Sequence, residues 1–112
     1  MDIAGVLASY MTQATGFPWY HDRPAGASGR LGTVTRDGGP TEMVRDMPTV
    51  TMLVYGDGRA DAAQAAQVAK RAFLEAPHHV ENVFTAEIMG DYYDPLDGMC
   101  RHRITATLVA ND

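Results

Sequence analysis

The sequence predicts a single small domain of the α+β class, with a mostly antiparallel sheet of about four strands and two helices packed on one face. The 112 residues are 46% hydrophobic and 21% charged, which is ordinary for one globular domain covering residues 1–112. Two segments carry apolar residues at helical spacing, and others are β-branched or alternate between apolar and polar residues. The expected order is α-β-β-α-β-β.

The N-terminal segment is the first predicted helix. Asp2 precedes it as a suitable N-cap, and Gly16 follows it as a residue suited to the left-handed conformation that ends many helices. Pro18 lies just beyond this end. The apolar residues at helical spacing are Ile3, Val6, Leu7, Tyr10, Met11 and Ala14.

The segment after this helix is rich in proline, glycine and small residues, so residues 17–29 are expected to form a loop. Residues 30–35 are β-prone and predict the first strand. The strand runs into a strong turn signal, in which Asp37, Gly38 and Gly39 are the predicted structural turn.

The second predicted strand is central in the sheet. It follows an irregular segment, residues 41–48, and its residues 49–55 are β-branched and apolar on both faces. A glycine pair, Gly56 and Gly58, then breaks the strand.

The second helix is expected at about residues 60–76 and should end because of Pro77. Asp61 and Gln64 look like a capping pair at its start. Many alanines on one face imply that the helix backbone lies close to the surface it covers. That face consists of Ala62, Ala65, Ala66, Ala69, Ala72 and Phe73.

Two further strands complete the predicted sheet, each with one apolar face. In the first, the residues on that face are Val80, Phe84, Ala86 and Ile88. In the last, Ile104, Ala106, Leu108 and Ala110 alternate with the more polar set Arg101, Arg103, Thr105, Thr107 and Val109.

The charge distribution excludes several classes of partner. The net charge is −5, and residues 81–99 contain five acids and no base, a surface that repels phosphate and disfavours nucleic-acid binding. No apolar run approaches the roughly 20 residues of a membrane helix, and the N-terminus lacks the basic start of a signal peptide. The single cysteine excludes an internal disulfide. The chain is therefore expected to be soluble, to fold in a cytoplasm and not to associate with a membrane.

No motif for a cofactor or metal is complete, so no cofactor is predicted. Gly56 and Gly58 lack the third glycine of a dinucleotide fingerprint, and Asp61 in its place would oppose a pyrophosphate. His78, His79, Cys100 and His102 match no closed zinc pattern. We expect Cys100 to be a free, buried thiol without metal.

No catalytic residues are predicted either, and the chain is not expected to be an enzyme. The aspartates at 91, 94 and 97 do not have the spacing of a calcium loop, and residues 26–29 (GASG) are not a nucleophile elbow. A small oligomeric enzyme or ligand-binding domain is the alternative of a different class. Its only candidate bases are His21, His78 and His102.

From Gly29 onward the chain resembles the tail terminator proteins of long-tailed phages, particularly those of actinobacterial phages and prophages. Residues 34–39 (VTRDGG) lead to residues 46–48 (DMP) and then to a strand ending in Tyr55. An alanine-rich helix and an edge strand follow. The acidic residues 90–97 (GDYYDPLD) then precede an arginine-led last strand, residues 101–107 (RHRITAT). Asp37 and the pair Cys100-Arg101 depart from the usual residues of this family.

The resemblance implies a virion protein that forms a homohexameric ring at the head-proximal end of the tail tube. Such a ring would end tube polymerisation and join the tail to head-completion or neck proteins. Its partners would be copies of itself, the tail tube protein and the neck protein, and DNA would pass through it without specific binding. The protein would be assembled in the host cytoplasm. Another neck or tail-tube ring component is the alternative within this class.

Two sets of charged residues are expected to matter in such a ring. Arg101 and Arg103 are predicted to lie on the polar face of the last strand, and Glu81 and Glu87 on the strand before it. Antiparallel pairing can match them within a chain. We expect at least one arginine instead to reach an acid on the neighbouring subunit.

The second set is the acidic segment with Asp91, Asp94 and Asp97, which is predicted to be a mobile loop facing the lumen of the ring. A channel through which DNA slides should present carboxylates, because each neutralised phosphate adds affinity and slows passage. A solvated hairpin on the outer or head-facing surface is the alternative for this segment.

Overall fold

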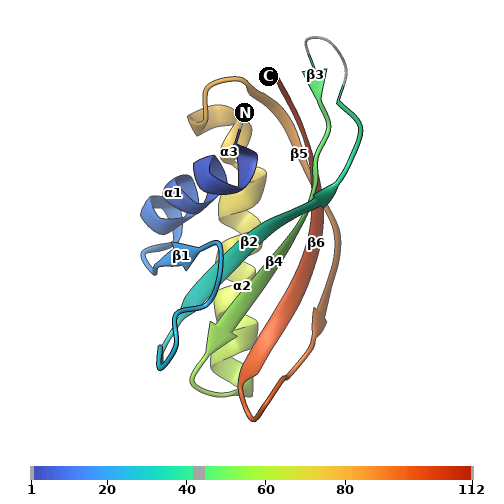
Figure 1. Cartoon of the computed structure of the whole chain (residues 1–112). Helices are drawn as coiled ribbons and strands as arrows, with labels where there is room; N and C mark the ends of the chain where they lie inside the picture. The colour runs from blue at the N-terminus through green and yellow to red at the C-terminus, as the bar shows by residue number, and fades with distance from the viewer. Residues whose placement is uncertain (1, 42–44, 112) are drawn as a thin grey trace.

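A computed structural model describes residues 2–41 and 45–111. Its class is mixed α+β, as predicted, but it has more elements than predicted. Figure 1 shows the helices gathered on one side of a single twisted sheet. In chain order the elements are α1 (Ile3–Thr15), β1 (Trp19–Tyr20), β2 (Leu31–Gly38), β3 (Arg45–Asp46), β4 (Thr49–Gly56), α2 (Arg59–Leu74), α3 (Ala76–His79), β5 (Val83–Tyr93) and β6 (Cys100–Asn111).

Four long antiparallel strands form the main part of the sheet, in the spatial order β2-β4-β6-β5. The two additional strands are short. β1 pairs in parallel with the start of β2, and β3 pairs with the end of β6. β4 is central, between β2 and β6, as its two apolar faces predicted.

β1 lies inside the segment predicted to be a loop. The Trp19 side chain is buried over Gly32, where an added Cβ would lie 2.5 Å from the indole ring. The Trp19 backbone N–H donates to the Thr12 hydroxyl at 3.0 Å, and the indole N–H donates to the Thr15 hydroxyl at 3.0 Å. One buried tryptophan therefore fixes the path of an otherwise loop-like segment.

The ends of α1 are as predicted. The Asp2 carboxylate accepts from the Gly5 backbone N–H at 3.1 Å, and Gly16 has a φ of 82° at the C-terminal end. Ile3, Leu7 and Met11 are buried against the sheet.

The alanine face of α2 is buried, as predicted, and brings the helix close to β4. An added Cβ at Gly56 would lie only 2.5 Å from the backbone nitrogen of Ala62. α2 ends at Leu74, two residues before its predicted end. Pro77 instead lies in the first turn of α3, where the missing backbone N–H costs no helical hydrogen bond.

The predicted capping pair at the start of α2 was wrong. The N-cap is Gly58, and both side chains of the predicted pair bind Arg30. The Asp61 carboxylate accepts from Arg30 Nε at 2.9 Å, and the Gln64 amide oxygen accepts from its terminal nitrogen at 3.2 Å.

β2 is longer than predicted and includes two of the three predicted turn residues, Asp37 and Gly38. The register with β4 shifts between Arg36 and Gly38, and the Asp37 carboxylate accepts a hydrogen bond from the Thr51 hydroxyl. Gly39 follows the strand with a φ of 101°. Of the predicted irregular segment, residues 42–44 lie outside the described residues, and β3 lies within the remainder.

β5 also differs from its prediction at both ends. It begins at Val83, so Val80 and Glu81 precede it. A register shift between Val83 and Thr85 turns the Phe84 side chain outward, and it is 51% exposed instead of buried. At the other end the strand continues to Tyr93, so Asp91 is a strand residue.

The main core lies between the helices and the helix-facing side of the sheet. Its largest fully buried side chains include Phe73, Leu7, Met11, Met52 and Ile104. In the described part of the chain no helix has the length and apolar character needed to cross a membrane.

Candidate functional site

The face of the sheet opposite the helices, which we call the open face, carries a band of threonines. Residues directly opposed in antiparallel strands point to the same face. Thr35, Thr51 and Thr105 are opposed in one row across β2, β4 and β6, and Thr33, Leu53 and Arg103 are opposed in the next. Figure 1 shows no helix on this side of the sheet in the described ranges 2–41 and 45–111.

At one end of the open face, arginines surround the Asp94 carboxylate. Arg101 donates from Nε to the Asp94 backbone carbonyl at 2.8 Å and from a terminal nitrogen to its carboxylate at 3.1 Å. Arg103 Nε donates to the same carboxylate oxygen at 2.9 Å. The hydrogen bond from Arg103 is the main reason that the pKa of Asp94 lies below its ordinary value.

Arg101 is buried, contrary to its predicted position on a solvated polar face. Its side chain packs beside Tyr55, whose hydroxyl accepts from it at 3.3 Å, and the residue is only 7% exposed. A charge this buried is stable only when its hydrogen bonds are satisfied, as Asp94 and Tyr55 satisfy them here.

A third arginine, Arg23, which belongs to no motif in the sequence, completes this end of the face. The Arg23 guanidinium carbon lies 5.3 Å from the centre of the Tyr55 ring, and a terminal nitrogen donates to the Ala27 carbonyl. Among the described residues, its buried Nε has no hydrogen-bond partner. Three guanidinium groups and one carboxylate leave an excess of positive charge here. Arg23 comes from a proline- and glycine-rich loop, in which nothing in the local sequence signals this role.

The predicted interface acids lie apart from these arginines. Glu81 is exposed just before β5, and Glu87 is exposed on β5 opposite Thr107. In residues 2–41 and 45–111 neither acid forms an ion pair with Arg101 or Arg103, which bind Asp94 instead.

The three aspartates predicted to share a mobile acidic loop have three different environments. Asp91 is on β5 and faces the helices, whereas Asp94 is held by the arginines. Asp97 alone is exposed in the tight turn closed by Leu96 and Met99, where its φ is 53°. The shared-loop prediction was wrong because β5 and its pairing with β6 extend further than expected.

Asp91 lies in a polar cluster between α2 and the sheet. Its carboxylate oxygens are 2.7 Å from Lys70 Nζ and 2.8 Å from His102 Nδ1. Burial alone would raise the pKa of Asp91, but these two partners outweigh it and leave the pKa below its ordinary value. An ion pair between Lys70 and Asp91 therefore ties α2 to β5, and the contact of Asp91 with His102 ties β5 to β6.

Cys100 adjoins this cluster and is less buried than predicted. It is free of disulfides, but it is half-buried rather than buried. It lies at the side of Tyr93, whose ring in turn contacts His102 at a centroid distance of 5.7 Å and Arg59 at 4.5 Å. In the described ranges no three histidine, cysteine or acidic side chains are grouped as metal ligands.

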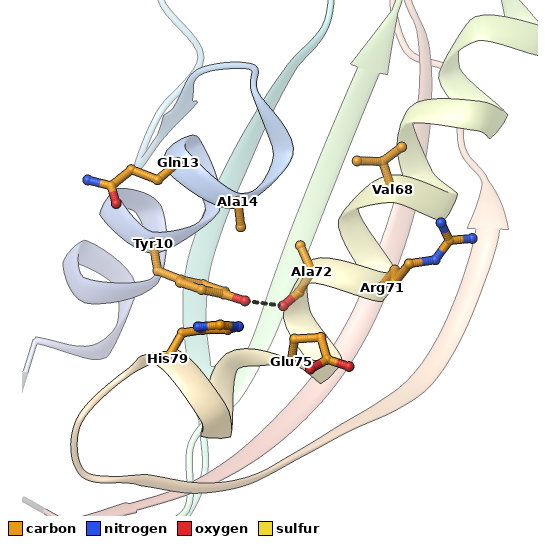
Figure 2. A pocket seen from close by; sticks show the side chains of 8 residues that line it. All are labelled: Tyr10, Gln13, Ala14, Val68, Arg71, Ala72, Glu75 and His79. Atoms are coloured by element: carbon orange, nitrogen blue, oxygen red, sulfur yellow. Dashed lines mark hydrogen bonds between the residues drawn. The ribbon is translucent and has the colours of Figure 1, made fainter.

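An open groove of about 670 Å³ lies among the three helices (Figure 2). The Tyr10 hydroxyl donates to the Ala72 backbone carbonyl at 2.6 Å, and its ring stacks on His79 at 6.1 Å. Burial and, to a lesser degree, the charge of Glu75 raise the pKa of Tyr10. The lining residues are Tyr10, Gln13, Ala14, Val68, Arg71, Ala72, Glu75 and His79.

The groove does not bring together the three histidines that the alternative hypothesis of an enzyme requires as bases. His21 is paired with its exposed neighbour Asp22, His78 lies on the short helix α3, and His102 is bound to Asp91. None of the three lines the groove. The open face, with its arginine end and its two edges, is accordingly the candidate functional surface.

The fold has a counterpart among solved structures, although no protein-family profile matches the sequence and no curated protein is significantly similar to it. A chain in a structure described as the virion of a native gene transfer agent (GTA) particle superposes with a TM-score of 0.70. The match covers 99% of this chain and 98% of that chain, at 14% sequence identity. The two chains therefore share one fold over nearly their whole lengths.

Proposed function

We propose that this chain is a structural subunit of a virion or virion-like particle. The observation that carries the proposal is the end-to-end fold match to a chain of the gene transfer agent virion. Because 98% of that chain is covered, the likeness concerns a whole subunit rather than a widely shared domain within a larger protein. The resemblance of residues 29–107 to tail terminator proteins rests on sequence motifs and supports the same role independently.

In the specific form of this proposal the chain is a tail terminator. Copies of it close into a ring, six-fold by resemblance, at the head-proximal end of the tail tube. The ring ends tube polymerisation and binds the tail tube protein on one side and a head-completion or neck protein on the other. It resides in the virion after assembly in the host cytoplasm, and DNA passes through it without specific binding.

The architecture supports a ring whose inner wall is the open face. In the described residues, helices cover only one side of the sheet (Figure 1), and the middle of the other side carries uncharged threonines that are buried or half-buried. Neutral side chains do not neutralise phosphate, so they do not retard DNA. Asp97 is exposed in the turn at one end of this face, whereas Asp94 is held by Arg101 and Arg103, so the arginine end stays a positively charged part of the proposed wall.

Arg103 is the arginine better placed for a contact between subunits. Its side chain is 33% exposed, whereas that of Arg101 is 8% exposed. An acid from a neighbouring subunit can therefore reach Arg103 without displacing buried packing.

Electron microscopy of particles from a producer that lacks this gene tests the proposed function. Loss of a terminator should give tails longer than those of the wild type, with few or none joined to heads, and the gene supplied in trans should restore both features. Particles with normal tails attached to heads would contradict the proposal. Normal tail length with unjoined heads would favour another neck component instead.

A further inference from the structure

The geometry points to a specific contact between two copies of this chain. One copy contributes the β5 edge and the β5–β6 turn, residues 94–99, and the next contributes the β1–β2 edge and the Arg23 loop, residues 21–30. This inference rests on the proposed ring and specifies which surfaces form it. Three independent features of the described residues support it, namely strand direction, exposed apolar side chains and charge.

Both long edges of the sheet have unpaired backbone. In the described part of the chain, β5 pairs only with β6, which leaves one side of an 11-residue strand open. At the opposite edge β1 covers only Gly32 and Thr33 of β2. A long open edge is a template for another strand, and the register shifts of β5 near Phe84 and Met89 limit its regular part to residues 85–88 and 90–93.

Strand directions at the two edges are compatible with a ring. The four long strands alternate in direction, so β5 runs opposite to β2. Rotation about an axis along the strands preserves these directions, and the β5 edge of one copy then meets β2 of the next in antiparallel orientation. Thr35, Thr51, Thr105 and Gly90 form one row across the sheet, so the two edges meet at the same height without an axial shift.

The exposed apolar side chains gather at the same two edges. Phe84, Met89 and Tyr92 on β5 are 51%, 63% and 53% exposed. Leu96 in the following turn is 46% exposed, and Tyr20 on β1 is 36% exposed. A contact between these edges would remove this apolar surface from water.

Charges at the lower end of the two edges are complementary. The β5–β6 turn carries exposed Asp97, in a stretch of sequence with no base, and the Arg23 loop lies at the same end of the sheet, at the opposite edge (Figure 1). In residues 2–41 and 45–111, Asp97 has no ion pair and Arg23 has no carboxylate partner. Arg23 as a residue is only half-buried, so a carboxylate of the next copy would bind the part of its guanidinium that lies outside the buried Nε.

Charge reversal tests the ionic part of this contact. Arg23→Glu and Asp97→Lys should each weaken self-association by on the order of 10- to 100-fold in sedimentation equilibrium. An equimolar mixture of the two variants should regain self-association. In a ring in which the variants alternate, each junction joins either a lysine at 97 to a glutamate at 23 or Asp97 to Arg23. Circular dichroism of each variant checks that the monomer is folded. Single variants that associate like the wild type, or a mixture no better than either alone, would overturn the contact.

A substitution on the β5 edge tests the apolar part of this contact, and the same substitution on α2 is its matched control. Met89→Lys places a charge on the β5 edge, and Leu74→Lys makes the same change at the end of α2, where the side chain is 47% exposed. Met89→Lys should weaken association at least ten-fold, and Leu74→Lys should leave it unchanged. Equal effects of the two variants would exclude the β5 edge as the contact.

Cross-linking covers the case in which the free protein associates only weakly. Chains with Arg23→Cys and chains with Asp97→Cys, both also carrying Cys100→Ser, are mixed at high concentration with a short bis-maleimide. Covalent pairs should form in the mixture, and a control mixture with the second cysteine at Leu74 should give none. If no specific pairs form, the contact is wrong. Because the gene-deletion experiment scores tails rather than this contact, the proposed function can then still hold.

Discussion

Tyr55 and Arg101 face each other across the β4–β6 pair and form the centre of the arginine end of the open face. Arg101 donates to the Tyr55 hydroxyl at 3.3 Å, and its guanidinium carbon lies 6.0 Å from the centre of the Tyr55 ring. The same guanidinium binds Asp94, so one buried side chain ties β4, β6 and the β5–β6 hairpin together.

We expect Arg101→Ala to lower the free energy of unfolding by about 2–4 kcal/mol, because it removes a buried side chain from beside Tyr55, leaves the Tyr55 hydroxyl without Arg101, and leaves Asp94 with Arg103 as its arginine partner. Glu81→Ala is the control, since Glu81 is exposed and surface changes usually stay within about 0.5 kcal/mol. Urea denaturation at neutral pH measures both. Equal stability of the two variants would show that the Arg101 interactions contribute little.

Stability should fall in acid because of Asp46, whose carboxylate binds Arg36 at 2.7 and 2.8 Å. The Arg36 hydrogen bonds lower the pKa of Asp46 below its ordinary 3.8 despite the opposing effect of burial. A group with a lowered folded pKa stabilises fully above its unfolded pKa and loses that contribution as pH falls through the folded pKa. The loss should therefore begin near pH 4 to 5, about one unit above the ordinary value, and continue below it.

Denaturation measured from pH 7 to pH 2.5 checks this linkage. Asp46→Asn should be less stable than the wild type at pH 7, and the difference should shrink as the wild-type carboxylate becomes protonated. A difference that stays constant over the whole range would contradict the role given to Asp46.

Gly56→Ala should destabilise the fold by about 1–3 kcal/mol or more, because the new methyl group would collide with the backbone of α2 at Ala62. Gly58→Ala is the matched control. It lies two residues away, and its added Cβ would have no heavy atom within 4 Å. Thermal unfolding of the two variants compares them directly, and similar melting temperatures would contradict the close approach of α2 to β4.

In the assembled ring, the side chains of Asp91, Asp94 and Asp97 should lie nearer the symmetry axis than α2 does. This is expected if the open face lines the channel, because the three aspartates belong to the sheet and its hairpin whereas α2 lies behind the sheet. Coordinates of the ring measure it. Aspartates farther from the axis than α2 would mean that the helical side faces the channel.

The elements that the sequence predicted well depend on local chemistry. Asp2 and Gly16 mark the ends of α1 because capping acts within a few residues. The alanine face of α2 and the alternation from Ile104 to Ala110 report directly on the surface that is buried.

What the sequence did not predict depends on contacts between distant segments. β1 exists because Trp19 packs on Gly32, and the turn of Phe84 toward solvent follows from a shift in register that no local pattern reveals. Arg101 alternates as a polar-face residue should, and only the approach of Tyr55 and Asp94 explains its burial. Arg23 reaches Tyr55 from a loop with no periodicity at all.

Cryo-electron microscopy of the particle that contains this chain decides whether the proposed ring exists. We expect a closed ring of identical subunits, six by resemblance, at the junction of tail and head. A chain that is monomeric in the particle, forms a closed two-fold dimer, or lies away from this junction would exclude the proposed ring.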